Sequence, residues 1–353
     1  MKPRHLPPLI IFLLLLPHNR IKAQSHWEIT LGGEYMVTAY SFTSTDNAWG
    51  MGAEVAWWQR TDGRKPWHAL RKYPSLGVKG YVGWFPTSLC GHRFGVARMM
   101  RSPLTDWLDW EIGLGIATFT KPSFLTGDTT NVYITTAIVC LIDVGLNAHL
   151  NDQWQMGVRL IHSSNGMLHR PNRGLNFLRA DISYRFPTHN KCGKIEPAIA
   201  ETPVFERSSN INIMLSSGLV ESRHYMQQGM FYCYDAAIGY DYQPTQLMKV
   251  GATVDLWYNF SYRQQERWRN DVFDVPMYIG VMGTVEGFWG AVSLKAGIGY
   301  TVIRSAAVGI PIYERVGLYY NFGNNYVGIG MNAHAGQVEF IEWSLGHRFS
   351  LGR

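Results

Sequence analysis

The sequence predicts an all-β protein, a transmembrane antiparallel β-barrel of about 14 to 16 strands. After residue 23 the chain is a succession of segments of about ten residues, in which apolar and polar side chains alternate between turn residues. No later segment has the run of about 18 apolar residues that a transmembrane helix needs. The 353 residues include 13 Trp, 19 Tyr and 16 Phe but only 16% charged residues. Such aromatic residues concentrate where a barrel crosses the membrane interface, so the composition agrees with this fold class.

Residues 1–23 have the layout of a signal peptide. Lys2 and Arg4 precede an apolar run over residues 9–16, and a polar stretch leads to a cleavage position after Ala23. The apolar run is too short to span a membrane as a helix. The segment carries four basic residues and no acidic one, so its removal lowers the net charge from +6 to about +2. We therefore expect export to the bacterial outer membrane and no nucleic-acid partner, which would require a concentrated basic stripe.

The first half of the predicted barrel covers residues 24–187 and contains eight strands. They span residues 27–40, 49–59, 75–85, 94–101, 109–120, 136–150, 154–164 and 174–186. A connector over residues 188–209 follows, in a region that contains Pro187, Pro197 and Pro203. Because proline cannot donate a hydrogen bond to a neighbouring strand, the connector is not expected to pair within a sheet.

The second half covers residues 210–353 and contains eight more strands. They span residues 211–222, 230–242, 249–262, 275–287, 292–303, 312–322, 326–335 and 338–349. An even total of sixteen suits a closed barrel, in which every backbone group is paired and no sheet edge faces lipid. The leading prediction is one large barrel. The alternative is an eight-stranded barrel followed by a second β domain.

The cysteines and histidines do not form a metal-binding pattern. Cys90, Cys140, Cys192 and Cys233 are far apart and include no C-x-x-C pair, so the sequence leaves their disulfide pairing open. Cys140 lies within an apolar strand, where a small buried or lipid-facing residue is expected. His162 and His169 are separated by a turn and have no neighbouring cluster of carboxylates. Neither a metal nor a cofactor is expected, and the oligomeric state stays open.

The strand over residues 154–164 places a histidine and a serine on one surface. Side chains alternate between the two faces of a strand, so His162 and Ser164 share the apolar face, whereas Ser163 lies on the other. On the next strand Asn176 belongs to the apolar, lipid-facing side and Asp181 points into the barrel. A serine becomes a nucleophile when a histidine accepts its proton, and a third group commonly orients that histidine.

These residues lie within the sequence His162-Ser-Ser-Asn-Gly166 followed by Pro171-Asn-Arg-Gly-Leu-Asn176. The pattern resembles the motif of the lipid A 3-O-deacylase (acyloxyacyl hydrolase-like) family of outer-membrane proteins. The resemblance implies an eight-stranded barrel whose active site faces the outer leaflet and removes an ester-linked acyl chain from lipid A or a related glycolipid. Lipopolysaccharide modification by a carboxylic-ester hydrolase is the expected function. A non-enzymatic porin or transport barrel is the alternative.

The resemblance also implies a role for each matching residue. His162 is the general base, Ser164 the nucleophile, and Asn172 an oxyanion donor together with backbone N–H groups near Asn165 and Gly166. Asn176 stands where better-known members carry a glutamate. An amide oxygen can orient an imidazole, but it cannot offset the charge of an imidazolium, so a slower enzyme or a binding barrel without activity is expected.

The loop between these two strands contains further candidates. With a periplasmic N-terminus the odd-numbered strands run outward, which places residues 167–173 at the cell surface beside the lipid A leaflet. Arg170 and Arg173, together with His169, are candidate ligands of the lipid A phosphates, since arginine can bind a phosphate through two hydrogen bonds. Solvated turn residues are an equally weighted alternative.

Overall fold

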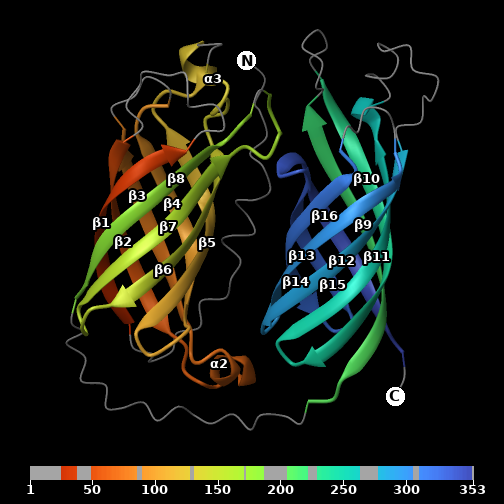
Figure 1. The fold of residues 1–353 in the computed structure, drawn as a ribbon, viewed down its shortest axis with the longest axis horizontal. Coiled ribbons are helices and arrows are strands. Elements are labelled where there is room, and N and C mark those ends of the chain that lie inside the picture. Colours follow the sequence, from red (N-terminus) through yellow and green to blue (C-terminus); the bar gives the residue numbers. More distant parts are fainter. Residues whose placement is uncertain are drawn as a thin grey trace. The chain divides into compact units, whose positions relative to one another are not determined.

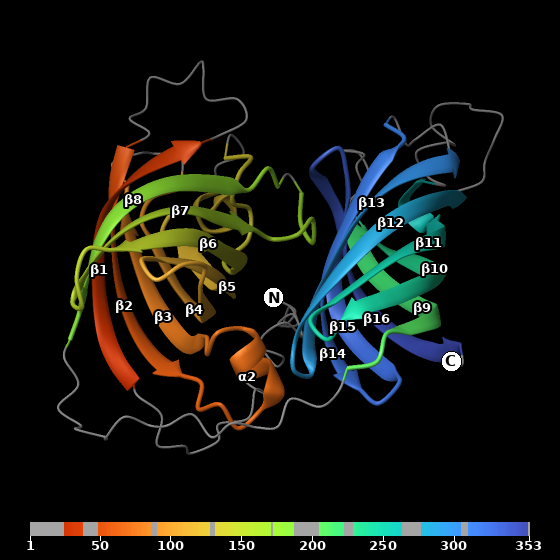
Figure 2. The ribbon, with the colours of Figure 1, turned by 60° about the horizontal axis from the view of Figure 1, so that its bottom comes forward.

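A computed structural model describes residues 25–37, 49–85, 90–127, 131–170, 172–186, 205–221, 229–262, 277–304 and 310–351. In the described part of the chain, sixteen strands close into two barrels of eight strands each (Figure 1, Figure 2). The expected signal peptide and the three connector prolines lie outside the described residues.

The first barrel is a meander in which each strand pairs with its neighbours in sequence. Its strands are β1 (Ser25–Val37), β2 (Trp49–Arg60), β3 (Ser75–Trp84), β4 (Arg93–Pro103), β5 (Leu108–Phe119), β6 (Val139–His149), β7 (Trp154–Ser164) and β8 (Leu175–Arg185). All pairs are antiparallel, and β8 returns to pair with β1 from Glu28↔Arg185 to Val37↔Asn176. That last pairing leaves the first barrel without an open edge.

The second barrel has the same topology. Its strands are β9 (Ser208–Glu221), β10 (Met230–Thr245), β11 (Met248–Asn259), β12 (Met277–Trp289), β13 (Val292–Ile303), β14 (Ile312–Phe322), β15 (Asn325–His334) and β16 (Gln337–Leu351). Its closing pair is β16 with β9, from Ile341↔Leu219 to Leu351↔Ser209.

The all-β barrel class and the sixteen strands are confirmed, and the strand boundaries agree with the predicted ones to within about three residues. The leading prediction of a single barrel is wrong, and the alternative with an eight-stranded barrel holds. The second β domain is itself a closed barrel. Alternation of apolar and polar residues determines which face of a strand meets lipid, but it does not determine whether β8 pairs with β1 or with β9.

Two short helices in the first barrel were not predicted. Helix α2 (Pro66–Leu70) lies between β2 and β3, and α3 (Ser123–Thr126) lies between β5 and β6. Each is too short to show a helical period in the sequence. No described helix is long and apolar enough to cross a membrane.

The outer faces of the strands form an apolar surface. On β7, for example, Met156, Val158 and Leu160 are about half exposed, whereas Gln155 and Arg159 on the opposite face are buried. The same alternation runs through the other strands of both barrels. Exposed apolar side chains over a whole barrel surface match the lipid-facing band of a transmembrane barrel.

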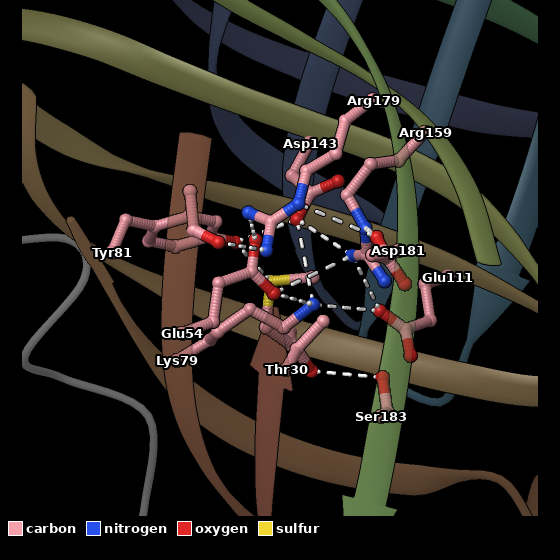
Figure 3. A network of polar contacts seen from close by, with 12 residues as sticks. Thr30, Glu54, Lys79, Tyr81, Glu111, Asp143, Arg159, Arg179, Asp181 and Ser183 are labelled. Carbon is pink, nitrogen blue, oxygen red and sulfur yellow. Dashed lines mark hydrogen bonds and ion pairs between the residues drawn. The ribbon is translucent and has the colours of Figure 1, made fainter. Parts of the chain in front are cut away.

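Charged side chains fill the interior of the first barrel (Figure 3). Lys79 donates to Glu111 at 2.9 Å and pairs with Glu54 at 3.2 Å. Tyr81 donates to Asp143 at 2.7 Å, and Arg159 donates to Asp181 at 2.7 Å. Buried charges are tolerated when they are paired and hydrogen-bonded. This interior is therefore a packed polar core.

A second ionic cluster fills the interior of the other barrel. Arg315 pairs with Asp235, with Asp255 at 3.1 Å and with Glu342 at 2.9 Å. Glu339, which strict alternation places with the apolar side of β16, is 1% exposed and pairs with His334 at 2.8 Å. The pairing of β15 with β16 shifts at this point, from Asn332↔Phe340 to Ala333↔Val338. The resulting bulge turns Glu339 inward.

The two ends of the first barrel differ in the length of their connections. At one end four residues join β4 to β5 and four join β6 to β7, and α2 lies in the connection between β2 and β3. At the other end the connections, which include the β7–β8 loop, are each longer than these two four-residue turns. Outer-membrane barrels have short periplasmic turns and long outer loops. We therefore assign the β7–β8 loop to the outer side.

Candidate active site

His162 is hydrogen-bonded to both Ser164 and Asn176 on the outer face of the first barrel. It lies directly opposite Asn176 in the pairing of β7 with β8. Its Nδ1 is 2.8 Å from Asn176 Oδ1, and its Nε2 is 3.0 Å from Ser164 Oγ. Because an amide oxygen only accepts, Nδ1 carries the proton and Nε2 accepts from the serine hydroxyl. This is the tautomer that a general base for Ser164 requires.

The three side chains lie at the boundary between the barrel and the lipid. Ser164 is 6% exposed, whereas His162 and Asn176 are half-buried. Leu160 and Leu178, next along the same faces, are 48% and 55% exposed. Exposed apolar side chains therefore flank the serine on this outer face.

Among the described residues of β7 and β8, no carboxylate lies on this outer face. Asp181 points into the barrel and accepts from Arg159, as the alternation predicts. Ser163 also lies on the inner face and is fully buried. In the register between β6 and β7, Cys140 lies opposite Ser164 and Ile142 opposite His162. The orienting acceptor for His162 is therefore an uncharged amide.

Gly174 allows the chain to pass close to the His162–Ser164 pair. Its φ is +65°, a left-handed value that glycine adopts without strain. A Cβ at this position would lie 3.0 Å from both His162 Cε1 and Ser164 Cβ. No role was predicted for this glycine, although its position directly before β8, in a turn rich in Asn and Gly, was a signal.

The β7–β8 loop contains the residues expected to bind the oxyanion. The side-chain oxygen of Asn172 accepts from the Asn165 N–H at 3.3 Å, and the Asn165 amide donates to His169 O at 2.8 Å. The Asn165 N–H is thus engaged by Asn172 in this structure. Gly166, with φ +62°, follows in the turn. The Asn172 side chain accepts through its oxygen in this contact, and its N–H₂ is its donor group.

The two arginines expected to bind phosphate lie in the same loop. Arg173 is exposed, and its backbone N–H donates to Val132 O at 3.0 Å, which ties the loop to the β5–β6 connection. Arg170 is half-buried. Pro171 between them lies outside the described residues.

Metal ligands do not gather near this site. Among the described residues, no group of three or more His, Cys, Asp or Glu side chains is arranged to hold a metal ion. Cys90, Cys140 and Cys233 are not in disulfides, and Cys192 lies outside the described part of the chain.

Two family models match the chain, one on each barrel. The model described as lipid A 3-O-deacylase (PagL) matches residues 51–185. The model described as the C-terminal domain of acyloxyacyl hydrolase matches residues 209–351. The first barrel is thus similar to the lipid A 3-O-deacylase family. The hydrogen-bonded residues His162, Ser164 and Asn176 all lie within the region that matches the lipid A 3-O-deacylase model.

Solved structures are similar to this chain at low identity. The crystal structure of the outer membrane enzyme PagL is 16% identical and covers 46% of this chain and 99% of its own, with a TM-score of 0.32. A triple mutant of the Rhodopseudomonas blastica porin is 8% identical and covers 92% of this chain and 99% of its own, with a TM-score of 0.19. Among curated proteins none matches the chain.

Proposed function

We propose that the first barrel is an outer-membrane esterase that removes an ester-linked acyl chain from lipid A or a related glycolipid by a Ser–His mechanism. One observation carries the proposal: His162 joins Ser164 to Asn176 through two hydrogen bonds on a lipid-facing surface. A polar group of this kind is costly in hydrocarbon and is expected where the substrate is a lipid.

In the proposed reaction Ser164 is the nucleophile and His162 moves the proton. Ser164 Oγ attacks the acyl carbonyl carbon while Nε2 of His162 accepts the hydroxyl proton. The tetrahedral intermediate collapses, the ester C–O bond breaks, and the imidazolium gives its proton to the departing sugar oxygen, which leaves as a hydroxyl. A water molecule then attacks the acyl–serine ester with His162 again as base, which releases the fatty acid and restores Ser164.

Asn176 orients the imidazole in this scheme. Its Oδ1 accepts the Nδ1 proton and so fixes the tautomer and the ring plane. An amide does not neutralise the imidazolium that forms during attack, so this step has a higher barrier than with a carboxylate in the same place. We propose a slow enzyme.

The β7–β8 loop supplies the other contacts. The Asn172 side-chain amide and the Gly166 N–H are proposed to stabilise the oxyanion, with the Asn165 N–H joining them after release from Asn172. Arg170 and Arg173 are proposed to bind the phosphates of the lipid A headgroup. The outer position of this loop supports both roles, because lipid A occupies the outer leaflet.

The filled interior favours an enzyme over a porin. Lys79, Glu54 and Arg159 are fully buried within the network of the first barrel, so its centre is packed rather than open. A porin would instead present a water-filled channel.

The proposal is tested by expressing the full chain in an outer membrane that contains lipid A. Mass spectrometry of the extracted lipid A is expected to show a species lighter by one acyl chain, which disappears with Ser164→Ala at equal amounts of folded protein. Unchanged lipid A together with unit conductance steps in planar bilayers would instead assign the chain to the porins.

A further inference from the structure

The connection between β2 and β3 is strongly basic. Residues 60–73 contain five lysines or arginines and one acidic residue, Asp62. The basic side chains of Arg60, Arg64, Lys65 and Lys72 are exposed. The segment also carries Trp67 and Tyr73, aromatic types that favour the membrane interface. This basic rim, residues 60–73, includes α2 and lies at the short-turn end of the first barrel (Figure 1).

Internal hydrogen bonds hold the basic rim against the barrel. Ser102 donates to Arg71 O at 3.1 Å, and Lys72 Nζ donates to Leu104 O at 3.1 Å. Asp62 pairs with Arg64 and with His68, each at 3.3 Å. The single acid is therefore engaged within the segment and leaves a net positive surface. These bonds anchor the rim to the C-terminal end of β4, so its charges have a fixed position relative to that strand.

Arg98 adds an isolated charge directly above this rim. It is the sixth of the eleven residues of β4, and its neighbours Ala97 and Met99 are buried inside the barrel. Alternation places Arg98 on the outer face with Phe94 and Val96, which are 44% and 45% exposed. Across the strand pairs it lies opposite Val78 and Leu114.

No other lysine, arginine, aspartate or glutamate lies on the outer face of the described strands β1–β8. No hydrogen bond or ion pair joins the Arg98 side chain to another described residue. A charged side chain on the lipid face is costly unless it reaches a polar partner, and arginine does so by extending its apolar stem along the barrel. Ser102, four residues after Arg98 on the same face of β4, donates a hydrogen bond to Arg71 O in the rim.

We propose that Arg98 and the basic rim together bind the headgroup of an anionic glycerophospholipid in the inner leaflet. The phosphate lies among Arg64, Lys65 and Arg71 at the rim, Arg98 extends down the face of β4 towards it, and the acyl chains cover the apolar surface of β3 and β4. Charge complementarity selects an anionic over a zwitterionic headgroup, since each basic residue near the surface adds to the attraction. The site lies at the opposite end of the first barrel from Ser164, and its ligand differs from the proposed substrate.

Native mass spectrometry of the full-length protein in neutral detergent tests the site. Phosphatidylglycerol and phosphatidylethanolamine with identical acyl chains are titrated separately, and the lipid-bound fraction is measured. Wild type is expected to retain several-fold more phosphatidylglycerol, and raised salt should reduce the difference. Arg64→Gln with Lys65→Gln should weaken that retention by about 30-fold, and Arg98→Leu by about fivefold.

Matched controls distinguish a specific phospholipid site from nonspecific attraction by positive charge. Lys121→Gln with Arg304→Gln removes two exposed charges elsewhere and should leave phosphatidylglycerol retention unchanged, as should Arg98→Lys. Retention of lipid A should not fall in the rim variant, and inorganic phosphate should not displace the phospholipid. Equal retention of the two phospholipids by wild type would overturn the proposal, as would equal losses in the rim and control variants. Displacement by inorganic phosphate would instead show an ion site without lipid selectivity.

Discussion

Asn176 accepts the Nδ1 proton of His162 at 2.8 Å from the directly opposite position on the neighbouring strand. The contact joins two rigid strands, so it holds the imidazole without the aid of a loop. The opposite ring nitrogen is then free of its proton and faces Ser164. A neutral amide thus fixes the tautomer, and in the proposed reaction it leaves the charge of the imidazolium without a counter-ion.

Ser164→Ala is expected to abolish deacylation, whereas Ser163→Ala should leave most of it. Ser164 Oγ is 3.0 Å from His162 Nε2, but Ser163 is fully buried on the inner face. Loss of a nucleophile in a Ser–His site lowers the rate by about 10³-fold or more. Deacylated lipid A from cells with equal amounts of folded protein gives the measurement. Equal losses in both variants would contradict the assignment of Ser164.

Asn176→Glu is expected to retain or raise activity, and Asn176→Leu to lower it by about 10²- to 10⁴-fold. A carboxylate orients the imidazole and also stabilises the imidazolium, although its burial has a desolvation cost that limits the gain. Leucine removes the acceptor. The initial rate of fatty acid release from lipid A in mixed micelles distinguishes the variants. If Asn176→Leu matches wild type, Asn176 does not orient His162.

Gly174→Ala is expected to lower activity by at least about tenfold while the barrel stays closed. The new methyl group meets His162 and Ser164 at 3.0 Å, so one hydrogen bond of the pair must lengthen. Gly336→Ala is the control, because Gly336 also has a positive φ, +75°, but a Cβ there meets nothing within 4 Å. Both variants carry the backbone strain of about 1–2 kcal/mol. Heat-modified gel mobility should show that the barrel is folded in both variants, whereas only Gly174→Ala should lose activity. Similar activities in the two variants would exclude the steric explanation.

Arg98→Leu is expected to stabilise the protein by about 2 kcal/mol in vesicles of zwitterionic lipid. The substitution removes a charge that has no partner among the described residues. Denaturant unfolding followed by tryptophan fluorescence measures the difference, and Arg98→Lys should show no gain. In vesicles that contain anionic lipid the gain should shrink. A loss of stability in zwitterionic vesicles would show that Arg98 already has a favourable contact within the protein.

Cys90 is expected to react very slowly with thiol reagents in the folded protein. It lies in the β3–β4 connection, fully buried, and burial raises the pKa of its thiol to about 12. At pH 8 only about 10⁻⁴ of the thiol is ionised, and the thiolate is the reactive form. Peptide mapping after iodoacetamide treatment should find Cys90 labelled only after unfolding. Rapid labelling of folded protein would show that this connection opens.

The sequence was sufficient to predict the strands and their lipid-facing sides, because the alternation has a period of two and extends over whole segments. It also brought His162, Ser164 and Asn176 together, since the first two share a face and the third follows on the adjoining strand. It could not predict that β8 pairs with β1, which depends on interactions between residues about 150 positions apart. The inward turn of Glu339 depends on a single extra residue in β16, and the close approach of Gly174 depends on a turn geometry. Neither leaves a periodic signal.

Arg179 on β8 donates to Glu34 and Glu54, its partners 145 and 125 residues earlier in the chain. These bonds cross the seam between β8 and β1 and form only once the ring is complete. An unfinished sheet would bring the guanidinium into the membrane without them, so insertion of a partial intermediate is strongly disfavoured. We therefore expect the first barrel to assemble in a single cooperative step. Because the second barrel closes at its own seam, we expect two such steps for the chain rather than one.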